Sequence, residues 1–343
     1  MNVIDFFCGG GGMTRGLLNA GIDVLFGLDF NSSCRQTYEA NNHVPYLSRD
    51  ILETESRQLI EMFPEVADND ELLMVGCAPC QPFSRQRRSD GEHISINLLD
   101  EFSRLVTDIM PAHILIENVP GINGKGKKVL NRFKSMLDNN NYSYDFQIIN
   151  AKDYGVPQNR KRYILIASRL FVPHIPEATH GEGLYPYARV FDAIHHFPAI
   201  QAGESNSDIP NHKSAGLSTL NLERIRATPH NGGDRTTWPQ RLYLKCHSGE
   251  YKGHTDVYGR MAWNSVSPTL TSKCFSLSNG RFGHPEQDRA ISLREAASIQ
   301  SFPEDYIFYG PVQNIGKQIG NAVPVLMAEE IGRYILEMHN NLG

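Results

Sequence analysis

The first 170 residues alternate short apolar runs with longer amphipathic stretches, and this alternation restricts the possible folds more than any other feature. Apolar runs occupy residues 2–6, 23–28, 72–75, 113–116 and 163–167, and helical periodicity is expected near 13–20, 32–42, 96–110 and 127–138. Strands that alternate with helices are typical of βαβ units and a parallel sheet. The sequence therefore predicts an α/β domain with a mostly parallel sheet.

The pattern changes after about Arg169, where Pro, Gly, His and Asn become frequent and sustained periodicity is lost. We expect a smaller region of loops and short strands there, followed by helices near 293–301 and 325–338. A chain of 343 residues is long enough for two such domains. The predicted boundaries are 1–169 plus 314–343 for the sheet-bearing domain and 170–313 for the smaller domain.

The net charge of −5 argues weakly against a nucleic-acid partner, but the charges are unevenly distributed. Residues 1–150 carry 13 basic and 20 acidic side chains, whereas residues 151–300 carry 18 and 13. A basic middle segment is consistent with a region that binds a polyanion, and equally with a chance distribution.

The cysteine content and the hydropathy argue against a disulfide-rich secreted protein and against a membrane protein. Six cysteines in a chain of this length do not form a disulfide scaffold, so we expect reduced thiols in a cytosol. No apolar stretch approaches the roughly 20 residues of a membrane helix, and we expect no signal peptide at the N-terminus.

A glycine-rich turn, residues 9–12, separates the first apolar run from the first predicted helix. Glycines let the backbone approach a ligand and adopt positive φ, and a helix N-terminus favours an anion. Asp29, at the end of the second run, is placed to bind ribose hydroxyls. The turn predicts a nucleoside cofactor, with NAD, FAD and S-adenosylmethionine open. Thr14 or Arg15 replaces the third glycine of a dinucleotide motif, which disfavours the first two.

The turn after the apolar run 72–75 carries two cysteines, Cys77 and Cys80. A redox pair would need a helix N-terminus, which Pro82 disfavours, and a zinc site would need two further ligands at suitable spacing. We favour a single nucleophile on a rigid turn, because Pro79 and Pro82 restrict the backbone. Ligands of open α/β sheets also bind at the carboxyl ends of the strands.

Six short motifs occur in order along nearly the whole chain. They are Asp5–Gly12, Gly76–Ser84, Glu117-Asn118-Val119, Gln158-Asn159-Arg160-Lys161-Arg162, Arg289–Pro303 and Gly320-Asn321-Ala322-Val323-Pro324. Together they resemble the motifs of the DNA (cytosine-5) methyltransferases. The resemblance implies the Rossmann-like fold of S-adenosylmethionine-dependent methyltransferases with a loop-rich target-recognition domain. It also implies methyl transfer to C5 of a cytosine in duplex DNA, with S-adenosylhomocysteine as product.

The resemblance implies four catalytic residues. Cys80 is expected to add to C6 of a flipped-out cytosine, for which a thiol of pKa ~8.5 must lose its proton. Glu117 is expected to share a proton with N3 and to accept from the N4 amine. Arg162 is expected at O2, with Arg160 nearby or on a phosphate. The motifs do not identify the base that removes the C5 proton.

The same resemblance implies a cofactor site and no metal. Phe7 and Phe30 are expected on the two faces of the adenine, Asp29 on the ribose and Asp50 on the adenine amine. Asp29 stands where the family usually has glutamate, so the cofactor geometry can differ slightly. Further contacts are expected from Gly9, Gly11, Pro79, Leu98 and Asn321.

DNA contacts are expected from the loop after the nucleophile and from a recognition region in residues 170–275. Gln86 or a neighbour is expected to fill the gap left by the flipped base. The other candidates are Ser84, Arg87, Arg241, Lys245, Arg260 and Thr269. Contacts to phosphates and contacts to bases cannot be separated from sequence.

Three alternatives stay open at this point. A tRNA methyltransferase of the same family would carry a Cys-Phe-Thr element, and the nearest match is Cys274-Phe275-Ser276. A non-catalytic DNA-binding relative and an oxidoreductase fit the motifs less well. We expect a monomer in a prokaryotic cytosol, acting on double-stranded DNA and not on membranes. A separate restriction endonuclease of the same specificity, or a solitary modifying role, would fit this chemistry.

Overall fold

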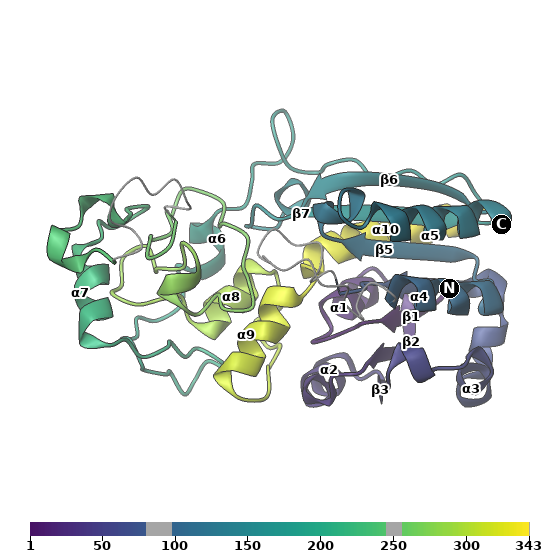
Figure 1. Cartoon of the computed structure of the whole chain (residues 1–343), viewed down its shortest axis with the longest axis horizontal. Coiled ribbons are helices and arrows are strands. Elements are labelled where there is room, and N and C mark those ends of the chain that lie inside the picture. Colours follow the sequence, from purple (N-terminus) through teal and green to yellow (C-terminus); the bar gives the residue numbers. More distant parts are fainter. Residues whose placement is uncertain (80–97, 245–255, 343) are drawn as a thin grey trace. The chain divides into compact units, whose positions relative to one another are not determined.

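The computed structural model describes residues 1–79, 98–244 and 256–342. Packing divides the chain into two compact units (Figure 1). The sheet unit comprises Met1–Tyr154, Lys161–Thr179 and Val323–Gly343. The loop unit comprises Gly155–Arg160 and His180–Ala322. Among the described residues, no helix is long and apolar enough to cross a membrane.

The described residues of the sheet unit contain one sheet with the strand order β3-β2-β1-β4-β5-β7-β6. The strands are β1 (Asn2–Phe6), β2 (Asp23–Asp29), β3 (Tyr46–Ser48), β4 (Leu72–Gly76), β5 (His113–Asn118), β6 (Ser143–Asn150) and β7 (Lys161–Ser168). Neighbouring strands from β3 to β5 are parallel, and β7 runs antiparallel to both β5 and β6. The predicted α/β architecture with a mostly parallel sheet is confirmed.

Helices cover both faces of this sheet. They are α1 (Gly12–Asn19), α2 (Arg35–Asn42), α3 (Ser56–Met62), α4 (Leu98–Ile109), α5 (Lys127–Asn139) and α10 (Val325–Asn340). Phe6 of β1 meets Phe102 of α4 edge to face at 5.4 Å, in a core that also includes α5. Its neighbour Asp5 accepts a hydrogen bond from Thr14 of α1. Because successive strand residues point to opposite faces, α1 lies on the face opposite α4.

The loop unit contains short helices and, in its described part, isolated β-bridges in place of strands. The helices are α6 (Val190–Ile194), α7 (Thr219–Ala227), α8 (Leu293–Ile299) and α9 (Val312–Asn321). The prediction of short strands in this region was therefore wrong. Backbone carbonyls that are not paired in strands accept hydrogen bonds from arginine side chains instead. Arg260, Arg281 and Arg294 each donate to several of them.

Most elements of the sheet unit begin and end within two residues of their predicted positions. The sequence did not predict β3, α3 or β6 in this unit, nor α6, α7 or α9 in the loop unit. Packing places α9, with all of residues 314–322, in the loop unit, whereas the predicted boundary placed these residues with the sheet. The assignment of a catalytic and a recognition role to the two parts stays a prediction.

Candidate active site

The glycine turn after β1 has a backbone that few other residues adopt. Phe7, Gly9 and Gly11 have φ values of 61°, 50° and 86°. A Cβ atom on Gly9 would meet nothing within 4 Å, so the turn is open on that side. Helix α1 begins directly after Gly11, which provides no side-chain cap. The turn therefore presents open backbone beside a helix N-terminus, as expected of a cofactor site.

Asp29, at the end of β2, holds this turn in place. Its carboxylate accepts from the backbone N–H of Gly9 at 3.0 Å and from that of Asn31 at 2.9 Å. Burial raises the pKa of Asp29 above its ordinary value, and these two hydrogen bonds oppose that rise. Each carboxylate oxygen keeps a second acceptor position, which is what a ribose diol needs. The ribose contact itself stays a prediction.

The other expected cofactor residues of the sheet unit also follow the carboxyl ends of parallel strands. Phe30 comes next after β2 and its side chain is 69% exposed, which is high for an aromatic residue. Asp50 follows β3 and accepts from the N–H of Leu52. Pro79 lies three residues after β4, and Leu98 opens α4; both are half-buried. Asn321 is exposed at the end of α9 in the loop unit.

Asp5 is a feature of this site that the sequence analysis did not single out as functional. It is fully buried, accepts from the Thr14 hydroxyl at 2.6 Å, and that hydroxyl also contacts Tyr38 OH at 2.9 Å. Its second oxygen, Oδ1, has no hydrogen-bond partner among the described residues. Burial raises the pKa of Asp5 to about 7. The sequence feature that could have identified Asp5 is its position as a carboxyl group within an otherwise apolar strand.

The ends of β5 and β7 bring two predicted catalytic side chains together. Arg162 Nε lies 2.6 Å from Glu117 Oε1, and both side chains are only 11% exposed. The next residue, Asn118, donates to the carbonyl of Ala78 at 3.3 Å. Glu117 therefore holds Arg162, and Asn118 holds the turn that carries the cysteines.

Several predicted residues lie outside the described ranges, among them the expected nucleophile. They are Cys80, Ser84, Gln86, Arg87 and Lys245. Their roles stay predictions. Neighbouring Cys77 is half-buried, and its backbone N–H donates to the carbonyl of Phe6.

Arg160 was expected beside the target base or on a phosphate, and the structure gives it other partners. The side chain lies in the loop unit with only 2% of its surface exposed. Its guanidinium donates to three backbone carbonyls, those of Leu270, Gly320 and Ala322. A guanidinium enclosed in this way is not placed to bind phosphate.

Arg260 also departs from its expected role as a DNA contact. Its side chain is fully buried and donates to the carbonyls of Thr228, Ile225 and His284, among others. The structure assigns it to packing of the loop unit. Arg241, by contrast, is 69% exposed, so its expected DNA contact stays a prediction.

Thr269 lies on the exposed surface of the loop unit. Its hydroxyl donates to the carbonyl of Asn159 at 2.6 Å. A threonine that hydrogen-bonds the backbone keeps a second lone pair and its methyl group for another partner. Its expected DNA contact also stays a prediction.

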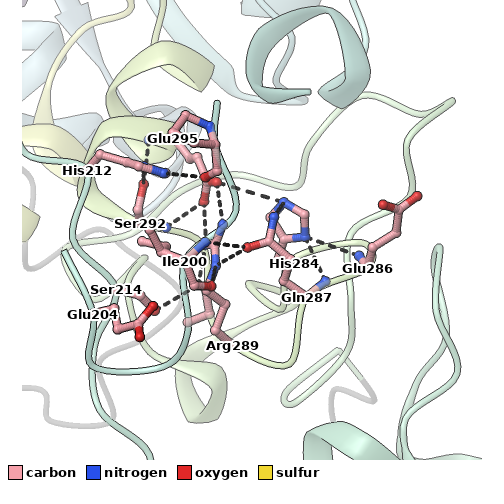
Figure 2. A network of polar contacts seen from close by, with 12 residues as sticks. Ile200, Glu204, His212, Ser214, His284, Glu286, Gln287, Arg289, Ser292 and Glu295 are labelled. Carbon is pink, nitrogen blue, oxygen red and sulfur yellow. Dashed lines mark hydrogen bonds and ion pairs between the residues drawn. The ribbon is translucent and has the colours of Figure 1, made fainter. Parts of the chain in front are cut away.

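A buried polar network stabilises the loop unit around the start of α8 (Figure 2). Arg289 and Glu295 form two parallel hydrogen bonds of 2.7 Å, and both are at most 1% exposed. Glu295 also accepts from the N–H of Ser292, whose hydroxyl contacts His212. Burial lowers the pKa of nearby His284 to about 4, so this histidine is neutral at pH 7. The motif containing Arg289 and Glu295 thus holds the fold of this unit.

Comparisons with known proteins agree with this geometry. The family model of C-5 cytosine-specific DNA methylases matches residues 1–337. Type II methylase M.HgiDII of Herpetosiphon aurantiacus is 40% identical, over 98% of this chain and 96% of that protein. Type II methyltransferase M1.HphI of Haemophilus parahaemolyticus is 32% identical, over 99% and 88%.

Two solved structures share the fold. A prophage-encoded protein of E. coli, described as a DNA modification methyltransferase, superposes with a TM-score of 0.74 at 22% identity, covering 99% of both chains. The S. pombe Dnmt2 methyltransferase gives 0.66 at 17%, also covering 99% of both. At these identities the likeness concerns the fold alone. The family model and the 40% identical relative, each spanning nearly the whole chain, show that the protein belongs to the C-5 cytosine-specific DNA methylases.

Proposed function

We propose that the protein transfers a methyl group from S-adenosylmethionine to C5 of a flipped-out cytosine in a specific duplex DNA sequence. The observation that carries this proposal is the buried pair of Glu117 and Arg162, with Asn118 tied to the turn that leads to Cys80. A carboxylate beside a guanidinium presents an acceptor and a donor side by side. Cytosine has its N4 amine, N3 and O2 in a row, so this pair matches its Watson–Crick edge.

Four side chains have separate roles in the proposed reaction. Cys80 forms the covalent bond, Glu117 and Arg162 bind the cytosine, and Asn118 holds the turn that precedes Cys80. The Cys80 thiolate forms a bond from Sγ to C6, and the electrons of the C5–C6 double bond move toward C5. Glu117 accepts from the N4 amine and, after taking up a proton, shares it with N3, and Arg162 donates to O2, so both stabilise the charge that develops on the ring. Asn118 positions the turn.

The cofactor in this proposal is S-adenosylmethionine, a nucleoside with a methionine tail, and the family to which the chain belongs supports it. S-adenosylmethionine, when bound, supplies an electrophilic methyl group that C5 takes up. Asp29 would accept from the ribose, and the exposed ring of Phe30 would cover the adenine. A general base then takes the C5 proton, and the Sγ–C6 bond breaks to restore the thiolate.

The substrate in this proposal is duplex DNA, from which the target base must be flipped out. In the part of the loop unit that the structure describes, the tRNA alternative has no specific support. Cys274 of the nearest Cys-Phe-Ser element is fully buried, and burial raises the pKa of its thiol to about 12. We further propose that the protein is a cytosolic monomer. The proposal that a separate restriction endonuclease acts on the same sequence is supported by the type II names of the relatives.

One experiment tests the reaction and the nucleophile together. The protein is expressed in a host without cytosine methylation, and sequencing of 5-methylcytosine in the host DNA yields the recognition sequence. Duplexes with 5-fluorocytosine at the target position are then incubated with enzyme and S-adenosylmethionine. We expect a covalent adduct with the wild type, because fluorine at C5 cannot leave as the proton does.

Cys80→Ser should lose the adduct, whereas Cys77→Ser, changed three residues earlier in the same turn, should retain it. An adduct of undiminished yield with Cys80→Ser would contradict the nucleophile assignment. Methylation of tRNA with none of DNA would contradict the substrate assignment.

A further inference from the structure

Arg160 joins chain segments that are distant in the sequence. Its guanidinium donates to the carbonyl oxygens of Leu270, Gly320 and Ala322, each at 3.0 Å. Leu270 belongs to the segment 267–272, and the other two belong to the segment 319–322. One buried side chain thus holds both segments by their backbones.

Gln158, two residues before Arg160, also helps to connect these two segments. Its side-chain oxygen accepts from the N–H of Leu270 at 2.9 Å, and its amide donates to Gln300 at 2.9 Å. Gln300 in turn donates to the carbonyl of Ile319 at 2.7 Å. Both glutamines are fully buried, so water does not compete for these bonds.

Glycine at position 320 lets the two segments touch. A Cβ atom on Gly320 would overlap the carbonyl of Thr271 and lie 2.5 Å from the nitrogen of Ser272. Only glycine permits backbones to approach so closely. The two segments therefore lie against each other, with Arg160 and Gln158 bonded to the first and Arg160 and Gln300 to the second.

Each segment carries one residue of the function proposed above. Thr269 is the expected DNA contact, and Asn321 is the expected cofactor contact; both are exposed. We propose that Arg160 is a positioning residue that couples these segments, so that the cofactor bound at Asn321 orders the DNA-contacting segment around Thr269. This inference rests on the proposed function. Because coupling between two binding sites is reciprocal, DNA bound at the first segment must tighten the cofactor to the same degree.

The chemistry of the side chain explains why the coupling depends on arginine. A guanidinium is planar and offers five N–H groups in fixed directions, so it can serve carbonyls from two segments at once. A lysine keeps the charge, but it has a single ammonium on a flexible stem. Arg160→Lys therefore preserves the charge and loses the geometry.

Hydrogen exchange of the full-length protein, with and without S-adenosylhomocysteine, tests the coupling. In the wild type we expect the ligand to slow exchange in peptides covering 317–323 and, through Arg160, in peptides covering 266–274. In Arg160→Lys the first peptides should still respond. The response of the second should be largely lost, because the side chain that connects the two segments no longer reaches both.

The matched control is Arg294→Lys. Arg294 is also fully buried and donates to three backbone carbonyls, those of Pro210, Pro303 and Tyr306, and none of its hydrogen bonds to described residues reaches either segment. This variant should show the wild-type response at both segments. A merely structural role for Arg160 would change the two variants alike.

The outcomes separate the inference from the proposed function. If calorimetry detects no binding of S-adenosylhomocysteine to the wild type, the cofactor assignment fails. If the ligand binds and both segments respond fully in Arg160→Lys, the packing at Gly320 is sufficient and the coupling role is refuted. Should Arg160→Lys not fold, the wild type alone still tests the coupling: a ligand response in peptides covering 317–323 with none in peptides covering 266–274 would refute it.

Discussion

Helices α1 and α10 approach each other so closely at Gly16 that a single methyl group there should be destabilising. A Cβ atom at this position would lie 2.5 Å from Ala328 Cβ, 2.6 Å from the carbonyl of Val325 and 2.7 Å from the nitrogen of Glu329. Ordinary contacts of this kind exceed 3.4 Å, and two of the three atoms are backbone. The helices must therefore separate by about 1 Å in Gly16→Ala.

The free energy of unfolding should fall by about 2 kcal/mol. Overpacking a core costs roughly 1–3 kcal/mol, and rigid backbone atoms place this site at the upper end of that range. Replacing glycine by alanine inside a helix returns roughly 0.5–1 kcal/mol. For a domain of about 150–250 residues, each kcal/mol shifts Tm by about 2–4 °C, so we expect Tm to fall by roughly 4–8 °C.

Gly332→Ala provides the matched control on the same helix pair. A Cβ atom there would lie 3.0 Å from side-chain atoms of Ala20 and Leu17, so the neighbours need to shift by only a few tenths of an ångström. Both variants gain the same helix propensity, so their difference isolates the backbone contact at Gly16. Thermal unfolding followed by far-UV circular dichroism measures both. If the two variants melt within about 1 °C of each other, the close-packing argument is wrong.

Two further predictions concern buried carboxyl groups. Burial raises the pKa of Asp5 from 3.8 to about 7, so the folded protein binds a proton that the unfolded chain releases between these values. The stability contributed by this proton is complete below about pH 4 and is lost as the pH rises to about 7. Asp5→Asn should therefore gain up to roughly 4 kcal/mol relative to wild type between pH 4 and pH 8, measured by chemical denaturation; a constant difference would contradict the pKa. Glu295→Gln breaks a buried ion pair and should cost roughly 3–5 kcal/mol, whereas Glu304→Gln, whose side chain is 65% exposed, should cost less than about 1 kcal/mol. The only tryptophans, Trp238 and Trp263, lie in the loop unit, so their fluorescence follows its unfolding; equal costs for the two glutamates would refute the burial argument.

Local patterns were sufficient to predict most of the sheet unit. The runs that became β1, β2, β4, β5 and β7 are apolar because both faces of the sheet are covered, and such runs can be read directly from sequence. Strand β6 escaped detection because it is an edge strand with largely exposed side chains, Phe146 and Ile148 among them. Its position depends on pairing with β7, which no local pattern reveals.

The sequence by itself determined the order and chemistry of the motifs, since the glycine turn, Glu117 and Arg162 are defined by residue type and by position at strand ends. Only the tertiary structure decided which arginines bind inside the protein. Arg160 and Arg260 were both expected to face DNA, and both are buried. The carbonyls that hold Arg160 belong to residues 110 to 162 positions farther along the chain. A charged side chain can be buried only where the fold supplies such partners, and their arrival from distant segments leaves no trace in the sequence around the arginine.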